Sequence, residues 1–270
     1  MTLATITLAS HSRALHLRRQ QERLRDAPGL ERVVVWLDAD PPPRDVPATL
    51  VLHVPPAAAG MRLAAARNAG AAAAIERGCD ALVFLDADCV PGEHLLSAYA
   101  RALQARPDGL LSGPVTYLPE GVLVDDATDL SALTEPHAAR PSPPDGTVLD
   151  ATQEQQLLFW SLSFALTART WRRIGGFDES YVGYGAEDTD FAMRASAASV
   201  TLSWVGGAHA YHQFHPTSSP PWQHLDDILR NGRLFADRWG FWPMLGWLEA
   251  FEAAGAVERV HGTWQRTAAP

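Results

Sequence analysis

Short apolar runs alternate with amphipathic or alanine-rich segments over the first 115 residues or so of the chain. Apolar, β-branched runs of this kind predict strands, and apolar spacing of three and four residues predicts helices. Expected strands cover residues 3–8, 32–37, 49–54, 81–88 and 109–115, and expected helices cover residues 14–26, 61–76 and 93–106. Strands that alternate with helices form parallel βαβ units. The predicted fold class is therefore α/β, a Rossmann-like, mostly parallel central sheet flanked by helices.

The second half of the chain begins with a segment that has no clear period. Residues 119–150 contain five prolines and predict a long loop, of the kind that is functional or mobile in compact domains. Order returns after Gln153. Expected elements are a half-exposed strand at 159–167, a short helix at 170–174, a helix from 187, a strand at 201–205 and C-terminal helices at 222–238 and 243–254; the tail after Val260 is expected to be loose.

Composition narrows the class of protein. With 47% hydrophobic and 20% charged residues, the chain has an ordinary globular composition. A net charge of -9 argues against nucleic acid as a partner, because phosphate backbones are bound by basic surfaces. We find no apolar run long enough for a membrane span and no signal-peptide pattern. Cys79 and Cys89 lack metal-type spacing, and we expect them to be reduced in a cytoplasmic protein.

The strongest chemical signal is a pair of acids after the strand expected at 81–88. Asp86 and Asp88 stand at the carboxyl end of this central strand, where open α/β sheets bind ligands. Side chains two residues apart in an extended chain point to the same side, and adjacent carboxylates repel unless a cation neutralises them. The pair predicts a divalent metal that holds a phosphate-bearing ligand. The alternative is a solvated loop in which Asp88 caps the next helix.

A second cluster of acids follows two glycines. Gly183 and Gly185 predict a tight loop, after which Glu187, Asp188 and Asp190 open a helix. Acids in the first turn of a helix are favoured by its dipole alone, which is the structural alternative. The functional interpretation is a general base with acceptor-binding acids, since a helix N-terminus keeps a base ionised.

Histidines and tryptophans near these segments complete the candidate chemistry. His212 and His215 follow the last expected core strand, and carboxylates with an imidazole suit Mn²⁺ better than Ca²⁺. Trp160, Trp204 and Trp222 flank the chemical segments, and each is a candidate for stacking on a sugar ring.

Taken together, these segments resemble a GT-A fold glycosyltransferase of family 2, and the second half also resembles the C-terminal domain of the galactosyltransferase family. The resemblance covers roughly residues 3–215. Each segment alone is weak evidence for the family, but the order and spacing of the segments together are specific. The segments that carry it are residues 5–8, 67–70, 84–88, 175–179, 183–191 and 211–216.

The resemblance implies an enzyme that moves a sugar from a nucleotide donor, typically a UDP-sugar, to an acceptor hydroxyl. The acceptor class stays open between a glycan, a lipid, a peptide and a small metabolite, met in solution or at a membrane surface. It also implies a glycosyltransferase domain over residues 1–220, with a nucleotide-sugar half at 1–118 and an acceptor half at 151–220. Residues 221–270, which lie outside the resemblance, are expected to form a C-terminal helical extension packed on the same domain.

The resemblance also assigns roles to individual residues. Asp188 matches the catalytic base, while Asp38 (with Asp40 as the alternative reader of the nucleobase), Arg67 and Asp86 match donor-binding residues. Glu187, Tyr184 and Trp160 are the expected acceptor-binding residues. Asp86 and Asp88, with His212 or His215, match ligands of Mn²⁺ or Mg²⁺.

The chemistry of such a transfer explains these residue types. A metal neutralises the leaving diphosphate, and a single base opposite the leaving group predicts inversion at the anomeric carbon. The loop at 119–150 is expected to order over the donor and exclude water. A nucleotidyltransferase is a rival, although the first turn, residues 9–13, has no glycine for a triphosphate. A non-catalytic nucleotide-sugar or glycan-binding module is a second rival.

Overall fold

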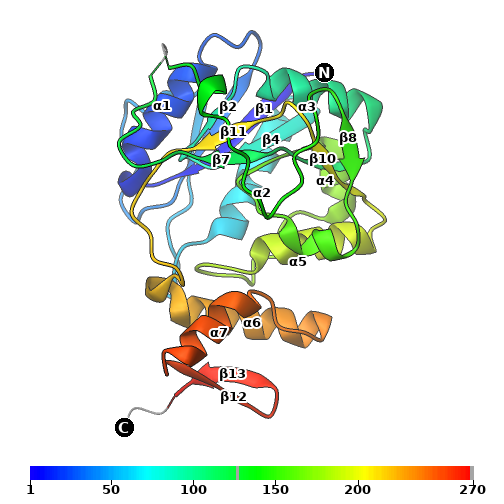
Figure 1. Ribbon diagram of the computed structural model, residues 1–270. Coiled ribbons are helices and arrows are strands. Elements are labelled where there is room, and N and C mark those ends of the chain that lie inside the picture. Colours follow the sequence, from blue (N-terminus) through cyan, green and yellow to red (C-terminus); the bar gives the residue numbers. More distant parts are fainter. Residues whose placement is uncertain (126–127, 268–270) are drawn as a thin grey trace.

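The computed structural model describes residues 1–125 and 128–267 and has at its centre a mostly parallel sheet (Figure 1). The strand order is β3-β2-β1-β4-β9-β6-β10-β8. Strands β9 and β8 run antiparallel to their neighbours, and the other six share one direction. The bounds are β1 Leu3–Ala9, β2 Glu31–Trp36, β3 Leu50–His53, β4 Ala81–Leu85, β6 Leu110–Ser112, β8 Val148–Asp150, β9 Ser163–Thr167 and β10 Leu202–Val205. The predicted α/β class is confirmed.

Helices cover both faces of this sheet. Alternate residues of each strand point to opposite faces, so Ile6 and Phe84 join one core cluster and Val83 joins another. Helices α2, α4 and α5 pack on the first face, and α1 and α3 pack on the second. The bounds are α1 Ala14–Leu24, α2 Leu63–Glu76, α3 Leu95–Ala105, α4 Ala168–Ile174 and α5 Glu187–Ala197.

A small second sheet lies at the carboxyl end of the central strands. It consists of β5 (Cys89–Pro91), β11 (Ala210–His212) and β7 (Val115–Tyr117), in that order. Because β5 follows Asp88 directly and β11 ends at His212, their pairing brings the acid pair and the histidine segment together. The predicted strand at 81–88 therefore ends at Leu85, and the two aspartates lie in the turn between β4 and β5.

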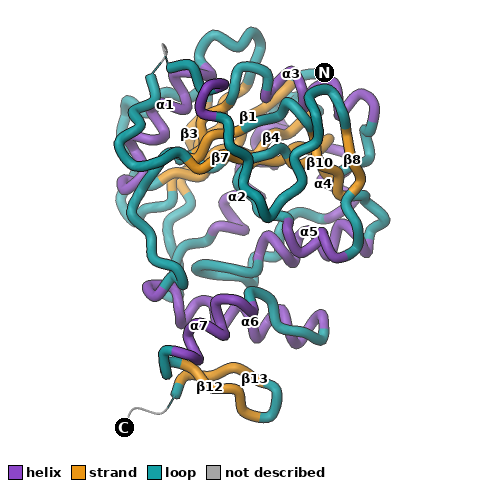
Figure 2. Tube along the Cα trace, in the orientation of Figure 1, coloured by secondary structure: helices purple, strands orange, loops and turns teal. Residues whose placement is uncertain are grey.

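Residues 222–267 form a helical pair and a hairpin below the main body (Figures 1 and 2). Helices α6 (Leu225–Trp239) and α7 (Leu245–Ala253) confirm the two predicted C-terminal helices. The prediction of a loose tail after Val260 is wrong for the described part, because β12 (Val257–Val260) pairs with β13 (Thr263–Arg266) and buries Trp264. Residues 268–270 of that tail lie outside the described residues.

Two other local predictions need correction. The strand at 159–167 is not half exposed: β9 is buried throughout, because its small residues face α3, where Ser163 Oγ is 2.8 Å from the Tyr99 hydroxyl oxygen. The segment 119–150 is a loop over most of its described length. Its end, however, forms edge strand β8, and Leu130 and Arg140 are buried. Residues 126–127 lie outside the described part.

Two further observations concern possible membrane helices and the two cysteines. Among the described residues, none of the helices has the length and apolar character needed to cross a membrane. Cys79 and Cys89 are free and buried. The cytoplasmic location stays a prediction.

A helical glycine makes the packing of α2 on the sheet testable. A Cβ atom at Gly70 would lie 2.5 Å from Ile6 Cγ2 and 3.1 Å from Val35 Cγ2. We expect Gly70→Ala to lower the free energy of unfolding by about 1–3 kcal/mol through overpacking. The control is Gly246→Ala in α7, where nothing lies within 4 Å and alanine is expected to stabilise by up to about 1 kcal/mol. Urea unfolding measures both, and equal effects would contradict the close packing of α2.

Candidate active site

The acid pair occupies a turn that is fixed from several sides. The amide of Asp86 donates to Leu162 O (3.0 Å), and the amide of Cys89 donates back to Asp86 O (2.8 Å). The buried side chain of Gln20 donates through Nε2 to the carbonyl oxygens of Asp86 (2.6 Å) and Cys89 (2.8 Å). The backbone of the turn is therefore held, and the carboxylates of Asp86 and Asp88 are free for other partners.

Asp88 forms a compact cluster with the two predicted histidines. Its Oδ1 lies 3.6 Å from His212 Nε2, and its Oδ2 lies 3.3 Å from His215 Nε2. One donor atom from each residue lies within 4.8 Å of the others. Arg13 also donates from Nε to Asp88 Oδ2, at 3.1 Å. The structure thus brings together both histidines and one of the two aspartates.

The donor atoms of this cluster fit a divalent cation. Burial disfavours a charged carboxylate, but the hydrogen bond with His215 and the neighbouring His212 and Arg13 hold the pKa of Asp88 well below its usual range. Burial lowers the pKa of His212, which favours the neutral imidazole that binds metals. An ionised carboxylate with two imidazoles is a donor set that suits Mn²⁺.

Asp86 lies outside this cluster and faces a buried arginine. Arg67 comes from α2, is 4% exposed and lies with Nη2 3.8 Å from Asp86 Oδ1. Its Nη1 donates to Glu187 Oε1 (3.1 Å) and its Nη2 donates to Ser161 Oγ (2.7 Å). Arg67 thus connects the first acid of the pair after β4 with the first acid of α5.

Two carboxyl groups in this region have pKa values close to neutral pH. Burial raises the pKa of Asp86 to about 7, against the opposing charge of Arg67. Burial and the charge of Glu187 raise the pKa of Asp188 to about 7, although its Oδ1 accepts a hydrogen bond from the Thr189 amide (2.7 Å). A carboxyl group poised near the working pH is suited to general acid–base catalysis.

The third acid of α5 has a different environment. Asp190 is fully buried, and its Oδ1 accepts hydrogen bonds from Arg238 Nη1 (2.7 Å), Trp239 Nε1 (2.9 Å) and the Tyr181 hydroxyl (3.3 Å). The prediction that Asp190 is an acceptor-binding acid is therefore wrong. It joins α5 to α6 instead, because carboxylates without solvent need several donors.

The candidate reader of the nucleobase stands at the end of β2. Asp38 Oδ2 accepts a hydrogen bond from the His11 amide (2.6 Å) and lies 2.9 Å from His11 Nδ1. The His11 ring packs against Trp36, with ring centroids 4.9 Å apart. Asp40 is exposed. Only Asp38 has these contacts, and its role in reading the base stays a prediction.

The aromatic candidates have different environments in the structure. Tyr184 is 36% exposed and stacks on His224, with ring centroids 4.4 Å apart. Trp160 is half-buried beside His137 and Arg140. Trp222 is exposed and packs against Phe251. Trp204 is 1% exposed in the main core, so the prediction that it stacks on a sugar is wrong.

Sequence reasoning missed several residues that shape this region: Arg13, Gln20, Tyr117 and Ser161. Tyr117 stacks on His212 with ring centroids 4.6 Å apart. Gln20 had a signal, because it lies three residues after Leu17 and four before Leu24, on the apolar face of α1. The other three come together only through the tertiary fold.

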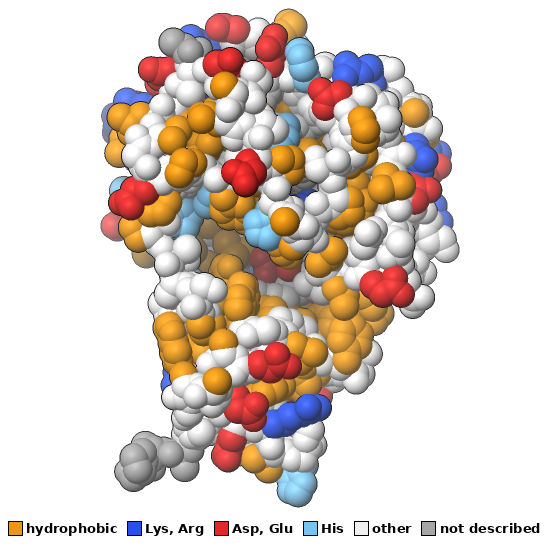
Figure 3. All heavy atoms as spheres, viewed as in Figure 1, with side chains coloured by type: hydrophobic (Ala, Val, Ile, Leu, Met, Phe, Trp, Pro, Cys, Tyr) orange, Lys and Arg blue, Asp and Glu red, His pale blue; other side chains and the backbone are white. Residues whose placement is uncertain are grey.

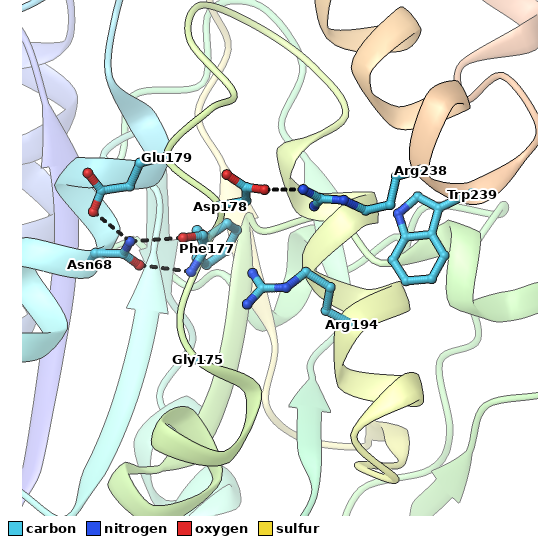
Figure 4. Close-up of a pocket in the computed structure, with 8 residues that line it drawn as sticks. All are labelled: Asn68, Gly175, Phe177, Asp178, Glu179, Arg194, Arg238 and Trp239. Carbon is cyan, nitrogen blue, oxygen red and sulfur yellow. Dashed lines mark hydrogen bonds and ion pairs between the residues drawn. The ribbon is translucent and has the colours of Figure 1, made fainter.

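Figure 3 shows a hollow between the main body and the C-terminal helices, with acidic and histidine side chains gathered around it. A separate cavity of about 520 Å³ lies where α2, the loop after α4 and α6 meet (Figure 4). It contains none of the predicted site residues. Its polar groups are already engaged: Asn68 bonds with Phe177 and Glu179, and Arg238 pairs with Asp178. The candidate chemistry therefore lies with the Asp88 cluster and Asp188 and not in this cavity.

The fold and this arrangement define the class of protein as a GT-A glycosyltransferase. Residues 51–215, about three-fifths of the chain, match the model of the family described as glycosyltransferase like family 2. The chain therefore belongs to this family, as its motifs indicate. The resemblance of the second half to the galactosyltransferase family stays a prediction.

One relative matches a short segment of the chain, and two solved structures share its fold. A validoxylamine A glucosyltransferase of Streptomyces hygroscopicus subsp. jinggangensis (strain 5008) is 37% identical over 62 residues, which are 21% of this chain and 14% of that protein. S. aureus TarS has a TM-score of 0.58 at 15% identity, over 87% of this chain and 39% of TarS. GalNAc-T7, crystallised with UDP, GalNAc and Mn²⁺, has a TM-score of 0.55 at 12% identity, over 88% of this chain and 50% of its own. The chain thus spans half or less of each of these relatives.

We expect the metal-free protein to lose stability as the pH rises from about 6 to about 8. Because the native pKa values of Asp86 and Asp188, about 7, lie above those of the unfolded chain, the native state holds protons that the unfolded chain has released. This stabilisation is present at low pH and is lost as the pH rises through about 7, with a change of about 1–3 kcal/mol.

Urea unfolding in the presence of EDTA at both pH values measures this change. The matched control is the double variant Asp86→Asn, Asp188→Asn, from which this part of the pH dependence should disappear. An equally steep dependence in the double variant would show that other groups are responsible.

Proposed function

We propose that this protein is a metal-dependent, inverting glycosyltransferase that moves a sugar from a UDP-sugar to an acceptor hydroxyl. The observation that carries this proposal is a metal-type cluster at Asp88 together with Asp188, a carboxyl group with a pKa of about 7, since the charges of both aspartates act on Asp86. Family membership supports sugar transfer, and neighbours crystallised with UDP-GlcNAc or with UDP and Mn²⁺ support the donor class and the metal.

Asp88, His212 and His215 would hold Mn²⁺ or Mg²⁺. When bound, the metal would neutralise the charge that develops on the leaving nucleoside diphosphate. Asp86 lies outside this cluster and faces Arg67. This position suits a donor-binding role, and its role as a metal ligand stays a prediction. Asp38 follows β2, at the same carboxyl edge of the sheet as Asp86. It is the proposed reader of the nucleobase.

Asp188 is the proposed base that takes the proton of the acceptor hydroxyl. Glu187 is less suited to this role, because it is buried and its carboxylate is tied to Arg67. Asp188 is only half-buried and has no cation within ion-pair distance among the described residues. With one base and no second carboxylate acting as nucleophile, we infer direct displacement and inversion at the anomeric carbon.

Glu187, Tyr184 and Trp160 are the proposed acceptor-binding residues. We infer a carbohydrate or related polyhydroxy acceptor, since an exposed tyrosine ring offers an apolar face to a sugar and carboxylates accept hydrogen bonds from hydroxyl groups. In this proposal residues 1–118 hold the donor, residues 151–220 the acceptor, and residues 221–270 form an extension packed on the same domain.

The donor and the metal are tested together by thermal unfolding. UDP-glucose, UDP-GlcNAc and GDP- and dTDP-sugars are added with and without Mn²⁺ to the wild type, Asp88→Ala and the surface control Asp237→Ala. A ligand at about 100 times its dissociation constant adds roughly 2.7 kcal/mol, or roughly 5 °C for this length. We expect a Mn²⁺-dependent shift with UDP-sugars that Asp88→Ala loses and Asp237→Ala keeps. No shift with any donor would refute the metal-dependent transferase and favour a binding module for another ligand.

The base is tested by Asp188→Asn, which keeps the shape of the side chain and removes its basicity. We expect the turnover of the UDP-sugar identified above to fall by about 10²–10⁴-fold, because proton transfer by a positioned group contributes that much. Its affinity for UDP with Mn²⁺, measured by calorimetry, should stay within about threefold. Glu187→Gln is the comparison, and a larger loss of turnover there would move the base to Glu187. NMR of the first product is expected to show the anomeric configuration inverted.

A further inference from the structure

The loop that leads into α5 is held by side chains of α6. The amide of Tyr184 donates to Asp227 Oδ2 at 3.1 Å. Arg230 Nη2 donates to Val182 O at 2.5 Å, and Asn231 Nδ2 donates to the carbonyl oxygens of Val182 (3.1 Å) and Tyr184 (3.2 Å). Backbone groups that a strand or helix would satisfy internally are here satisfied by a helix more than 40 residues later in the chain.

The packing at this contact is close enough to require glycine. Gly183 has a φ of +79°, and a Cβ atom there would lie 2.3 Å from Asp227 Cγ. Gly185 has a φ of +96°, and a Cβ atom there would lie 2.9 Å from Met244 Sδ. Both glycines are therefore needed for the left-handed backbone and for the approach of α6 and of the residue that precedes α7.

The same contact orients the ring of Tyr184. His224 stacks on this ring with an interplanar angle of 16°, and its Nδ1 lies 3.8 Å from Asp227 Oδ2. Asp227 is itself fixed, because Arg230 Nη2 donates to its Oδ1 at 2.6 Å. One carboxylate thus connects the amide of Tyr184, the histidine that supports the Tyr184 ring, and the arginine that holds Val182.

We propose that Asp227 is a positioning residue for the acceptor side of the active site. By fixing Tyr184, it sets where α5 begins, and so where Asp188, four residues later, stands relative to the acceptor. A second contact, from Arg238 and Trp239 to Asp190, holds the same helix start from the other end of α6. The C-terminal extension is then part of the catalytic machinery. This inference rests on the proposed transferase function.

The test compares Asp227→Ala with Asp227→Asn and with the matched control Asp237→Ala. Asp237 lies on the same helix, is exposed and also pairs with an arginine, Arg233, at 2.8 Å. Three quantities are measured in the full chain with Mn²⁺: amide hydrogen exchange in residues 182–186, the affinity for UDP, and the rate at which UDP is released from UDP-glucose and UDP-GlcNAc with water as the acceptor.

In Asp227→Ala we expect amide exchange in residues 182–186 to become at least tenfold faster and UDP release at least tenfold slower, while the dissociation constant for UDP changes less than twofold. Asp227→Asn keeps an oxygen that accepts from the Tyr184 amide, and should recover part of both losses. Asp237→Ala should match the wild type.

Two results would overturn the proposal. The first is unchanged UDP release in Asp227→Ala despite faster exchange, because the loop position would then not matter to the reaction. The second is a loss of UDP affinity equal to the loss of rate, which is what general damage to the fold produces. If the wild type neither binds UDP nor releases it, the transferase function itself fails. The exchange measurement still decides whether Asp227 holds the loop.

Discussion

Four carboxyl groups interact at this site: the charges of Asp88, Glu187 and Asp188 all act on Asp86, while the buried guanidinium of Arg67 pairs with Asp86 and Glu187. Like charges about 4 Å apart repel by about 4 kcal/mol at an effective dielectric constant of 20. Two arginines, Arg67 and Arg13, face these four acids, and burial together with the charges of neighbouring acids raises the pKa values of Asp86 and Asp188. Such a site gains from any bound cation, so the excess of acids and the proposed metal have one physical origin.

The rest of the fold supports this concentration of charge. Sheet pairing between β5 and β11 brings His212 to Asp88, and α2 carries Arg67 to the start of α5. Helix α5 is held from outside the sheet by α6, through Asp190 at one point and the loop at Val182–Tyr184 at another. Acids that repel one another stay together only where the backbone that carries them is fixed at several points, and each of these contacts supplies one.

The parts of this arrangement that the sequence predicts are those with local causes. Buried strands have continuous apolar runs, so the sheet follows from the five runs in the first 115 residues, and the position of Asp86 and Asp88 at its edge follows from residues 81–88. Gly183 and Gly185 predict a tight loop before α5. Arg13 and Ser161, in contrast, have no local pattern, because each meets its partner only after distant segments pack. The small residues of β9 give it the sequence pattern of a half-exposed strand, but they pack against α3 and do not face water. The terminal hairpin was missed because its buried residues, Val257 and Trp264, stand among polar residues.

Asp88 and Asp188 show how neighbouring groups give identical side chains different pKa values. Asp88 lies among His212, His215 and Arg13, so its pKa is low and it stays ionised, as a metal ligand must. Asp188 has burial and Glu187 as its main influences, so its pKa is about 7 and it can accept a proton at neutral pH. A base with the pKa of Asp88 would be too weak, and a ligand with the pKa of Asp188 would compete with protons for the metal. In the proposed function, this separation of histidines and an arginine around Asp88 from the carboxylates near Asp188 would allow one site both to hold a cation and to deprotonate a hydroxyl.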